Sequence, residues 1–413
     1  MIRSTKHSLK FANADKKAKL TAFLTEYQRV GQEIIDFIWR NGYGEFNVAA
    51  DKLEFPLYLD YKAFPVKTQL SARALSSLTT QISGAIRSAV KRRSKLLFVI
   101  RKKRAAKEDV LKLETRLTTK HKLVKPTFPA HAELSSKCTD IIREGSFGWF
   151  LHIKSTGFKA IKLPIPTHKR SEYWLARGAL KNSFLIRLNT VELRYEVKTV
   201  KSKGIKTVGV DQGVKSIATL SDGSVTPDTC PHGHSFNSVC DKLARKKKGS
   251  KAFEKAQAHR KNLINWSLNQ IAWDTFTEVR LEKIWNIGFG KRRSRKLAHF
   301  TNTLIRDKIK RCCEELEVPV VEQDSSYRSQ RCSNCGIVRK ANRKGKEYKC
   351  KHCGFESDSD LNAAKNHLAN LPVIDWTLRG QKYNLGNGFY WRESGLTTFD
   401  GQEFRVPDSP RKV

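Results

Sequence analysis

The stretch that decides the fold is TVGVDQGVKSIATLSDG, residues 207–223. It predicts two short apolar strands, Val208–Val210 and Ile217–Leu220, joined by a turn that contains Gly213. Asp211 stands at the end of the first strand, where a carboxylate is either a turn residue without chemistry or a functional group. Motifs elsewhere in the sequence are needed to distinguish these two interpretations.

The composition is that of a globular and strongly basic protein. The chain has 413 residues, of which 39% are hydrophobic, enough for several domains with buried cores and too many for a disordered polycation. Lys and Arg number 79 against 40 Asp and Glu, and the formal charge of +39 favours a polyanionic partner. No apolar run approaches the roughly 20 residues of a membrane span, and the N-terminus lacks the apolar core of a secretory signal. We therefore expect a nucleic-acid-binding protein in the cytoplasm.

The spacing of apolar residues divides the chain into segments. Helical spacing runs from about residue 17 to 40, and again from Leu75 to Val90, where it continues into a basic run. From about residue 120 to 200, prolines and alternating apolar residues predict a small β-barrel or sandwich. After residue 207 strands alternate with helices, which is typical of an α/β sheet.

Two basic runs are candidates for contact with phosphate. KRRSKLLFVIRKKR at 91–104 and ARKKKGSK at 244–251 are either solvated faces or segments that bind a nucleic-acid backbone, and the charge of the whole chain favours the second interpretation. Together with two arginines beside a CxxC pair, the candidate contacts are Lys91, Arg92, Arg93, Arg101, Lys102, Lys103, Arg104, Arg245, Lys246, Lys247, Lys248, Arg328 and Arg331.

Two CxxC pairs predict a metal site. Cys332 and Cys335 form the first pair and Cys350 and Cys353 the second, and each tight turn aims two sulfurs at one point. Together they supply the four thiolates of a tetrahedral, structural Zn²⁺ site. Two disulfides are the alternative, which a chain without a secretory signal disfavours. A second group lacks this paired spacing and is either a surface loop or another metal site: Cys230, His232, His234 and Cys240.

Three carboxylates lie on separate segments of the predicted α/β region. Asp211 ends the first strand, Glu282 lies in the strand VRLEKI, and Asp360 follows the second CxxC pair in SDSDLNAAKNH. Hydrolysis of a phosphodiester by two metal ions needs several carboxylates that converge from different elements. Glu278 could replace Glu282, and Asp358 could replace Asp360. If they have structural roles instead, Glu278 occupies an exposed strand position and Asp358 is the N-cap of a helix that begins near residue 361.

In this order the motifs resemble those of the transposon-encoded TnpB nucleases and the related compact type V CRISPR effectors. The split RuvC domain of that family begins with G-(I/V)-D-x-G, as at 209–213, continues with an apolar strand carrying Glu, as in VRLEKI, and ends with D-x-N-A-A, as at 360–364. A basic K-K-G-S-K segment is matched by KKKGSKAFEKAQAHR. The T-S-Q-x-C signature reads YRSQRC here, so Arg328 departs from the usual Thr. The resemblance is detailed over about 205–370 and only architectural over 1–200.

The resemblance implies a multidomain α+β fold. An N-terminal helical recognition lobe and an OB-like wedge β-barrel would precede an RNase H-like (RuvC) α/β domain with an inserted zinc ribbon. The expected segments are 1–15 for the start of the wedge barrel, 16–118 for the recognition lobe, 119–203 for the barrel, 204–326 for the nuclease domain with a basic helical insertion at about 240–275, 327–356 for the zinc ribbon, 357–370 for the last RuvC segment and 371–413 for a tail.

The resemblance also implies a function. Asp211, Glu282 and Asp360 would be catalytic and would hold Mg²⁺, as two ions, while the four cysteines hold Zn²⁺. The protein would bind a guide RNA from its own locus, recognise a short flanking motif in double-stranded target DNA, and cleave that DNA at one RuvC-like site. In a prokaryote such a protein would be associated with the nucleoid.

Two rival functions and the role of the tail stay open at this stage. An RNA-guided DNA-binding regulator without useful cleavage should lack one of the three acids, and none is missing. An unguided, transposon-associated DNA-processing protein should carry a Tyr or Ser nucleophile motif, or an acidic triad that joins DNA to a target without a guide. A His-hydrophobe-His transposase motif is absent, and HGH at 232–234 does not supply one. The tail is either disordered or stacks on RNA bases through its aromatic residues Trp376, Tyr383, Phe389, Tyr390 and Trp391.

Overall fold

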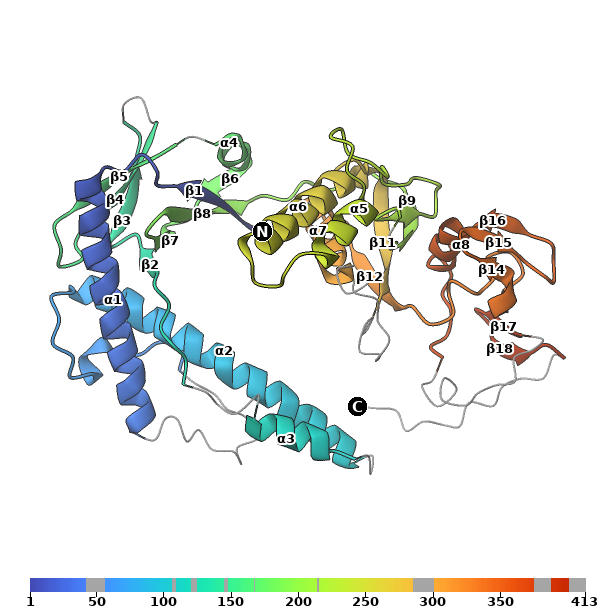
Figure 1. The fold of residues 1–413 in the computed structure, drawn as a ribbon, viewed down its shortest axis with the longest axis horizontal. Helices are drawn as coiled ribbons and strands as arrows, with labels where there is room; N and C mark the ends of the chain where they lie inside the picture. The colour runs from blue at the N-terminus through green and yellow to red at the C-terminus, as the bar shows by residue number, and fades with distance from the viewer. Residues whose placement is uncertain are drawn as a thin grey trace. The chain divides into compact units, whose positions relative to one another are not determined.

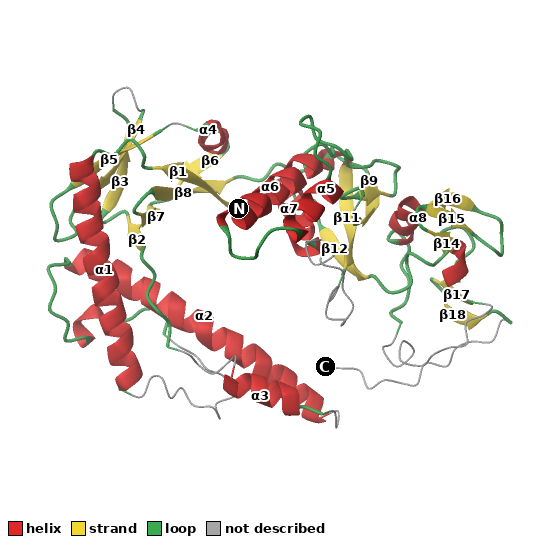
Figure 2. Ribbon diagram, viewed as in Figure 1, coloured by secondary structure: helices red, strands yellow, loops and turns green. Residues whose placement is uncertain are grey.

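The chain consists of two compact units, Met1–Lys198 and Thr199–Val413. Each unit has a hydrophobic core of its own, and Figures 1 and 2 show the elements of both. None of the described helices is long and apolar enough to cross a membrane. The computed structural model describes residues 1–41, 56–105, 109–119, 125–144, 148–166, 168–213, 215–284, 301–374 and 388–400.

Two long helices, α1 (Ala14–Arg40) and α2 (Ala72–Ala105), contribute to the core of the first unit. Helix α1 begins at Asn13, whose side chain accepts a hydrogen bond from the N–H of Lys16 at 3.0 Å. The apolar stripes that the sequence predicts on both helices are buried, except for Leu75, which is partly buried. The basic run at 91–104 is the continuation of α2, and the short helix α3 (Leu111–Thr119) follows it.

The strands of the first unit form two antiparallel sheets. One has the order β1-β8-β7-β2, with β6 paired to β8, and the other has the order β3-β4-β5. Since β1 pairs with β8 along its whole length, the first residues of the chain belong to the same sheet as the segment before residue 198. The elements are β1 (Ile2–Ser8), β2 (Ala132–Ser135), β3 (Thr139–Ile142), β4 (Trp149–Ile153), β5 (Ile161–Ile165), α4 (Lys169–Leu175), β6 (Gly178–Leu180), β7 (Ser183–Arg187) and β8 (Thr190–Val197).

A four-stranded sheet with the order β10-β9-β11-β12 forms the centre of the second unit. β9 (Lys206–Asp211) and β10 (Thr219–Leu220) are the predicted antiparallel pair. β11 (Phe276–Lys283) runs parallel to β9 and also to β12 (Val320–Asp324). Because the three long strands are parallel, their carboxyl ends lie at one edge of the sheet.

The two faces of this sheet are covered differently. Successive residues of a strand face opposite sides, and one side forms an apolar core with the helices, to which the sheet contributes Val208, Val210, Val279 and Leu281. The covering helices are α5 (Phe236–Ala244), α6 (Lys251–Leu268) and α7 (Asn302–Glu315). Helix α8 (Ser359–Asn366) packs against β9, and Figure 1 shows it on the side of the sheet away from α6 and α7. Gly209 and Asp211 alternate with the apolar residues and therefore face α8.

Two three-stranded sheets complete the second unit. They have the orders β14-β15-β16 and β13-β17-β18. The second sheet contains the tail segments 389–392 and 395–398, so this part of the tail is folded. Phe389 and Trp391 are buried there, and Tyr390 is partly exposed. Trp376 and Tyr383 lie outside the described residues. The strands are β13 (Ile337–Val338), β14 (Arg343–Lys344), β15 (Glu347–Lys349), β16 (Glu356–Asp358), β17 (Phe389–Arg392) and β18 (Gly395–Thr398).

Candidate active site and metal sites

Two of the predicted acids meet at the carboxyl edge of the central sheet. β9 and β11 are in parallel register with Val210 opposite Leu281, so Asp211 and Glu282 are the next residues on neighbouring strands. Asp211 is buried, and Glu282 is half-buried. The side-chain amide of Gln212 donates a hydrogen bond of 3.1 Å to the backbone carbonyl of Glu282, which ties the two strand ends together. This arrangement places two carboxylates at close range.

Burial and repulsion make the ionised forms of these acids unfavourable. Burial raises the pKa of Asp211 well above its ordinary value, and the charges of Glu282 and Asp360 raise it further. Burial raises the pKa of Glu282 to about 7, against the opposing field of Arg343. Like charges that share a buried site are stabilised by a cation between them. The cluster is therefore suited to a divalent metal ion.

Asp360 lies beside this pair but is engaged with basic side chains. Its carboxylate accepts a hydrogen bond from the Arg343 guanidinium at 3.2 Å and forms an ion pair with Lys346. It reaches the site from the first turn of α8, whose N-cap is Asp358. The alternative carboxylate Asp358 is therefore a capping residue.

Glu278, the other alternative, has a structural partner instead. It is half-buried on β11 and forms an ion pair with Arg280 at 2.7 Å. Arg280 in turn donates a hydrogen bond of 2.7 Å to Asn370, just beyond α8. Glu278 therefore helps to hold the segment after α8 and lies outside the acid cluster.

His367 is a member of the cluster that the sequence analysis missed. One oxygen of Asp211, one oxygen of Glu282 and one ring nitrogen of His367 all lie within 4.8 Å of one another. Burial and the charge of Arg328 lower the pKa of His367 to about 3, so the ring is neutral at physiological pH. The signal available in the sequence was the spacing in SDSDLNAAKNH, since seven residues make two helical turns and place His367 on the same helix face as Asp360.

Gly209 permits the close approach of α8 to the sheet. A Cβ atom at this position would lie 2.1 Å from the backbone carbonyl oxygen of Ala364 and 2.9 Å from the Cβ of His367. Neither of these atoms is the end of a flexible side chain, so a methyl group has to move the helix. The first glycine of the G-(I/V)-D-x-G pattern thus sets the distance between the strand and the helix that carries Asp360.

We expect Gly209→Ala to destabilise the second unit by about 1–3 kcal/mol, the usual range for overpacking, and to impair any activity that needs Asp211 and α8 together. Thermal unfolding measures the first effect. The matched control is Gly84→Ala on α2, where a Cβ meets nothing within 4 Å and alanine favours the helix by about 1 kcal/mol. Equal stability of Gly209→Ala and the wild type would contradict the close contact.

The raised pKa of Asp211 makes a second prediction. The unfolded chain loses this proton near pH 4, and the folded metal-free protein keeps it to a much higher pH. The stability of the metal-free protein therefore falls as the pH rises toward the pKa of Asp211 in the folded state. Asp211→Asn removes this loss of stability, because the amide does not ionise. We expect this variant, with zinc retained and no other divalent ion, to melt about 5 °C higher than the wild type at pH 8, with a smaller gain at pH 5.

The control for this experiment is Asp222→Asn. Asp222 is exposed and accepts a hydrogen bond from the N–H of Ser224. This variant should show no gain that grows with pH. A lower melting temperature for Asp211→Asn at both pH values would mean that the carboxylate is not under repulsion.

The four cysteines of the two CxxC pairs converge on one point. The sulfurs of Cys332 and Cys353 are 3.8 Å apart, and those of Cys335 and Cys350 are 3.7 Å apart. Four sulfurs at about 2.3 Å from a tetrahedral zinc ion have the same mutual spacing, about 3.8 Å. Among the described residues they form one of the two groups able to hold a metal ion. The cluster fits a structural zinc site in which no coordination position is left open.

Glycines shape the two turns that carry these sulfurs. Gly336 and Gly354 have φ angles of +83° and +74°, a region that side chains disfavour. The N–H of Gly336 bonds to the carbonyl of Cys332, and that of Gly354 to the carbonyl of Cys350, both at 3.0 Å. The repeated geometry gives each pair the same tight turn.

The cysteine cluster is joined to α8 by buried amides. The side chain of Asn362 accepts a hydrogen bond from the N–H of Ser333 at 3.0 Å and donates to the carbonyl of Arg331 at 2.8 Å. Asn366 donates to the carbonyls of Arg328 and Arg331 at 2.9 and 2.7 Å. The helix that carries Asp360 and precedes His367 is thus positioned by the cysteine turns.

Arg328 and Arg331 require a correction of the predicted nucleic-acid contacts. The two side chains are only 4% and 8% exposed. Arg328 donates to the carbonyls of Asp324 and Asn366, and Arg331 donates to the carbonyl of Trp391 at 2.7 Å. Their guanidinium groups bind backbone oxygens inside the protein, and this geometry gives them a structural role in place of phosphate contact.

The other candidate contacts lie on helix and loop surfaces. Lys91 and Arg101 are exposed on α2, and Arg104 forms an ion pair with Glu114 of α3. The side chains of Arg92, Arg93 and Lys102 lie outside the described set. The second run falls in the loop between α5 and α6, with Arg245, Lys247 and Lys248 exposed and Lys246 partly exposed.

The second Cys/His group does not form a metal site. Cys230, His232, His234 and Cys240 do not come together as ligands in the part of the chain that the structure describes. Cys240 is part of the apolar core, and His234 packs against His259 with ring centroids 4.7 Å apart. The surface-loop interpretation fits residues 230–234, which precede α5, but not Cys240, which is buried in that helix.

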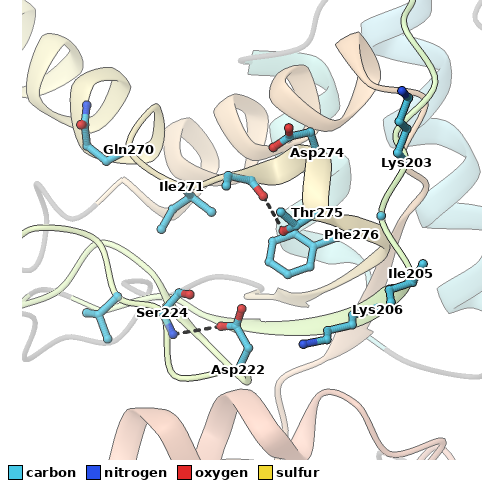
Figure 3. Close-up of a pocket in the computed structure, with 13 residues that line it drawn as sticks. Lys203, Ile205, Lys206, Asp222, Ser224, Gln270, Ile271, Asp274, Thr275 and Phe276 are labelled. Carbon is cyan, nitrogen blue, oxygen red and sulfur yellow. Dashed lines mark hydrogen bonds between the residues drawn. The ribbon is translucent and has the colours of Figure 1, made fainter.

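A pocket of about 900 Å³ opens at the opposite end of the central sheet, near Lys206 and Phe276, where β9 and β11 begin. Figure 3 shows its lining, in which Asp222 accepts the hydrogen bond from the N–H of Ser224. Asp222 and Asp274 belong to no group of metal ligands among the described residues. The pocket therefore lies away from the acid cluster, at the other end of β9 and β11.

Comparison with known proteins identifies the region that carries the cysteine cluster, Asp360 and His367, while Asp211 and Glu282 lie before it. Residues 304–367 match the family described as Cas12f1-like, TNB domain. The CRISPR-associated endodeoxyribonuclease Cas12f1 of Sulfoacidibacillus thermotolerans is 42% identical over 83 residues, which are 20% of this chain and 19% of that protein. The match thus spans about a fifth of the relative's length.

Solved structures share the fold over most of the chain. The Cas12f1 chain of a Cas12f1-sgRNA-target DNA complex aligns with a TM-score of 0.50 at 16% identity, covering 86% of this chain and 83% of that one. The mini-RNA-guided endonuclease CRISPR-Cas_phi3 aligns with a TM-score of 0.51 at 10% identity, covering 91% and 93%. The predicted mixed helix and sheet fold is confirmed. The chain carries a Cas12f1-like TNB domain within the fold of the compact type V effectors, which confirms its resemblance to that family.

Proposed function

We propose that this protein is an RNA-guided endonuclease that cleaves DNA by metal-dependent phosphodiester hydrolysis at a single RuvC-like centre. The observation that carries the proposal is the meeting of Asp211 and Glu282, with Asp360 beside them, at the carboxyl edge of a parallel sheet. The cluster stands next to a Cas12f1-like TNB domain. Buried acids of like charge are unfavourable without a cation, so a structural role alone does not account for them.

Divalent cations fit the chemistry of this donor set. Carboxylate oxygens suit Mg²⁺, and in this proposal Asp211, Glu282 and Asp360 hold two such ions. When bound, the ions activate water and stabilise the leaving oxygen. Gln212 keeps the two strand ends in register through its bond to the Glu282 carbonyl. Arg343 and Lys346 pair with the Asp360 carboxylate, and a metal ion would have to compete with them for it.

The four cysteines hold a structural Zn²⁺ ion in the same proposal. Their spacing matches a tetrahedral site. The amides of Asn362 and Asn366 connect the site to α8. The zinc ribbon thereby fixes the helix that presents Asp360 to the other acids.

The proposed partners are a guide RNA from the protein's own locus and double-stranded target DNA. The similar Cas12f1 structure is a complex with sgRNA and target DNA, and the Cas_phi3 protein is described as RNA-guided. The charge of +39 suits a guide–target duplex held through its backbone. Residues 16–118 and 119–203 would act as recognition lobe and wedge barrel, and the protein would recognise a short flanking DNA motif in the prokaryotic nucleoid.

The test is to express the protein together with its native flanking DNA, purify it and sequence the RNA that stays bound. We expect a discrete RNA with a structured scaffold and a variable end that matches the flanking sequence. Asp211→Ala should retain the same RNA, because the acid cluster is not needed to bind it. Recovery of degraded bulk cellular RNA alone would contradict the guided function and leave an unguided nuclease.

A further inference from the structure

His367 has an environment that packing alone does not explain. Its side chain is only 1% exposed, and neither ring nitrogen has a hydrogen-bond partner among the described residues. A buried polar group without a partner costs about 1–3 kcal/mol, and each such group in a folded protein calls for a reason, such as an ion. An imidazole nitrogen is among the commonest metal ligands in proteins, and a metal ion would give this buried ring a partner.

The unpartnered ring lies beside the two strand-end acids. Ligand atoms of Asp211, Glu282 and His367 lie within 4.8 Å of one another. Two donors on one octahedral ion with bonds of about 2.1 Å stand about 3.0 Å apart when adjacent and about 4.2 Å apart when opposite, so the three side chains have to move inward to share a single ion. The Asp360 carboxylate is occupied by Arg343 and Lys346.

The position of the ring is fixed by the backbone on both sides. His367 is the C-cap residue of α8, and its N–H bonds to the carbonyl of Ala364 at 3.0 Å. Gly209 allows the helix end to lie directly on β9. A ligand placed by such rigid elements is held ready before the metal binds.

We propose that His367 is a direct ligand of a divalent metal ion at the Asp211–Glu282 pair, and that this nitrogen donor shifts the preference of the site from Mg²⁺ toward Mn²⁺. The inference rests on the proposed nuclease centre, which by itself requires only carboxylates. Mg²⁺ favours oxygen ligands, whereas Mn²⁺, the first-row metal most similar to it in charge and geometry, accepts an imidazole nitrogen more readily. A centre with one nitrogen and two carboxylates therefore gains more with Mn²⁺ than an all-oxygen centre does.

The test measures metal binding on the full-length, zinc-loaded protein, without nucleic acid and without cleavage. Mn²⁺ binding is followed by the loss of the free-ion electron paramagnetic resonance signal, and Mg²⁺ binding by competition. We expect His367→Gln to weaken Mn²⁺ binding about 10-fold or more and Mg²⁺ binding less than about 3-fold. The matched control is His259→Gln on α6, which should leave both affinities unchanged.

A second measurement keeps the inference testable even if the variant folds poorly. Pulsed electron paramagnetic resonance of Mn²⁺ bound to the wild type should show coupling to an imidazole ¹⁴N nucleus, and Asp211→Asn should remove the bound ion. Tight Mn²⁺ binding without ¹⁴N coupling, or an unchanged preference for Mn²⁺ in His367→Gln, would overturn the role of His367 and leave the carboxylate centre intact. Mn²⁺ binding that is equal in the wild type and Asp211→Asn would overturn the carboxylate centre as well.

Discussion

Replacement of Glu282 by glutamine is expected to lower the rate of guided DNA cleavage by about 10³-fold or more and to leave the binding of guide RNA and target DNA unchanged. The side chain keeps its shape and loses the charge that holds the proposed metal ions. A 10³-fold loss equals about 4 kcal/mol of transition-state stabilisation. The measurement is single-turnover cleavage of a labelled target by the purified protein–RNA complex, with target binding followed in parallel.

The matched control is Glu278→Gln on the same strand. Glu278 pairs with Arg280 instead of facing Asp211, so its loss should reduce cleavage less than about 10-fold. If Glu278→Gln abolished cleavage while Glu282→Gln remained active, the assignment of the second acid would be reversed. If both variants cut at the wild-type rate, β11 would carry no catalytic residue.

Loss of the proposed zinc ion is expected to reduce DNA cleavage as strongly as the replacement of Glu282. Cys332→Ser should reduce the zinc content from about one ion per chain and remove about 5 kcal/mol or more of the ribbon's stability, since metal binding and folding are coupled in such sites. Cleavage should disappear at the same time, because Asn362 and Asn366 connect the cysteine turns to α8. Elemental analysis, thermal unfolding and cleavage assays check the three expectations.

The control for the zinc site is Cys230→Ser. Cys230 is a half-buried cysteine outside the cluster, and its replacement should keep the zinc content and the cleavage rate. Full zinc occupancy in Cys332→Ser would show that the four sulfurs do not share one ion. Full cleavage by a zinc-free variant would show that the ribbon does not position α8.

Much of the second unit could be predicted from the sequence because its signals are local. The apolar runs before Asp211 and around Glu282 specify strands, and parallel strands bring their carboxyl ends to one edge. The paired CxxC spacing brings four sulfurs together through turn geometry alone. Neither prediction needs knowledge of which helix covers which face of the sheet.

The remaining features depend on long-range packing. His367 joins the acids only because Gly209 lets α8 lie directly on β9. Asp360 is paired because a hairpin of the cysteine region brings Arg343 and Lys346 to it. A spacing pattern does not reveal contacts of this kind, which arise when separate elements dock.

For two basic residues, the sequence led to a wrong prediction of their environment. Sequence reasoning treats a Lys or Arg beside a metal-binding turn as a surface charge, yet Arg328 and Arg331 are buried. Their guanidinium groups bind carbonyls of residues such as Asn366 and Trp391, which come close only in the folded unit. The aromatic tail is ambiguous in the sequence for the same reason, since its strand β17 pairs with β13, about 50 residues earlier in the chain.

The most direct test of the central claim is cleavage of a plasmid that carries the sequence matching the co-purified RNA, by the wild type and by Asp211→Ala. We predict that the wild type cuts the matching plasmid in Mg²⁺, leaves a plasmid without the match intact, and binds without cutting when Ca²⁺ replaces Mg²⁺. Asp211→Ala should bind the same target and leave it uncut. Cutting that persists in EDTA, or in Asp211→Ala, would contradict a metal-dependent nuclease centre at Asp211.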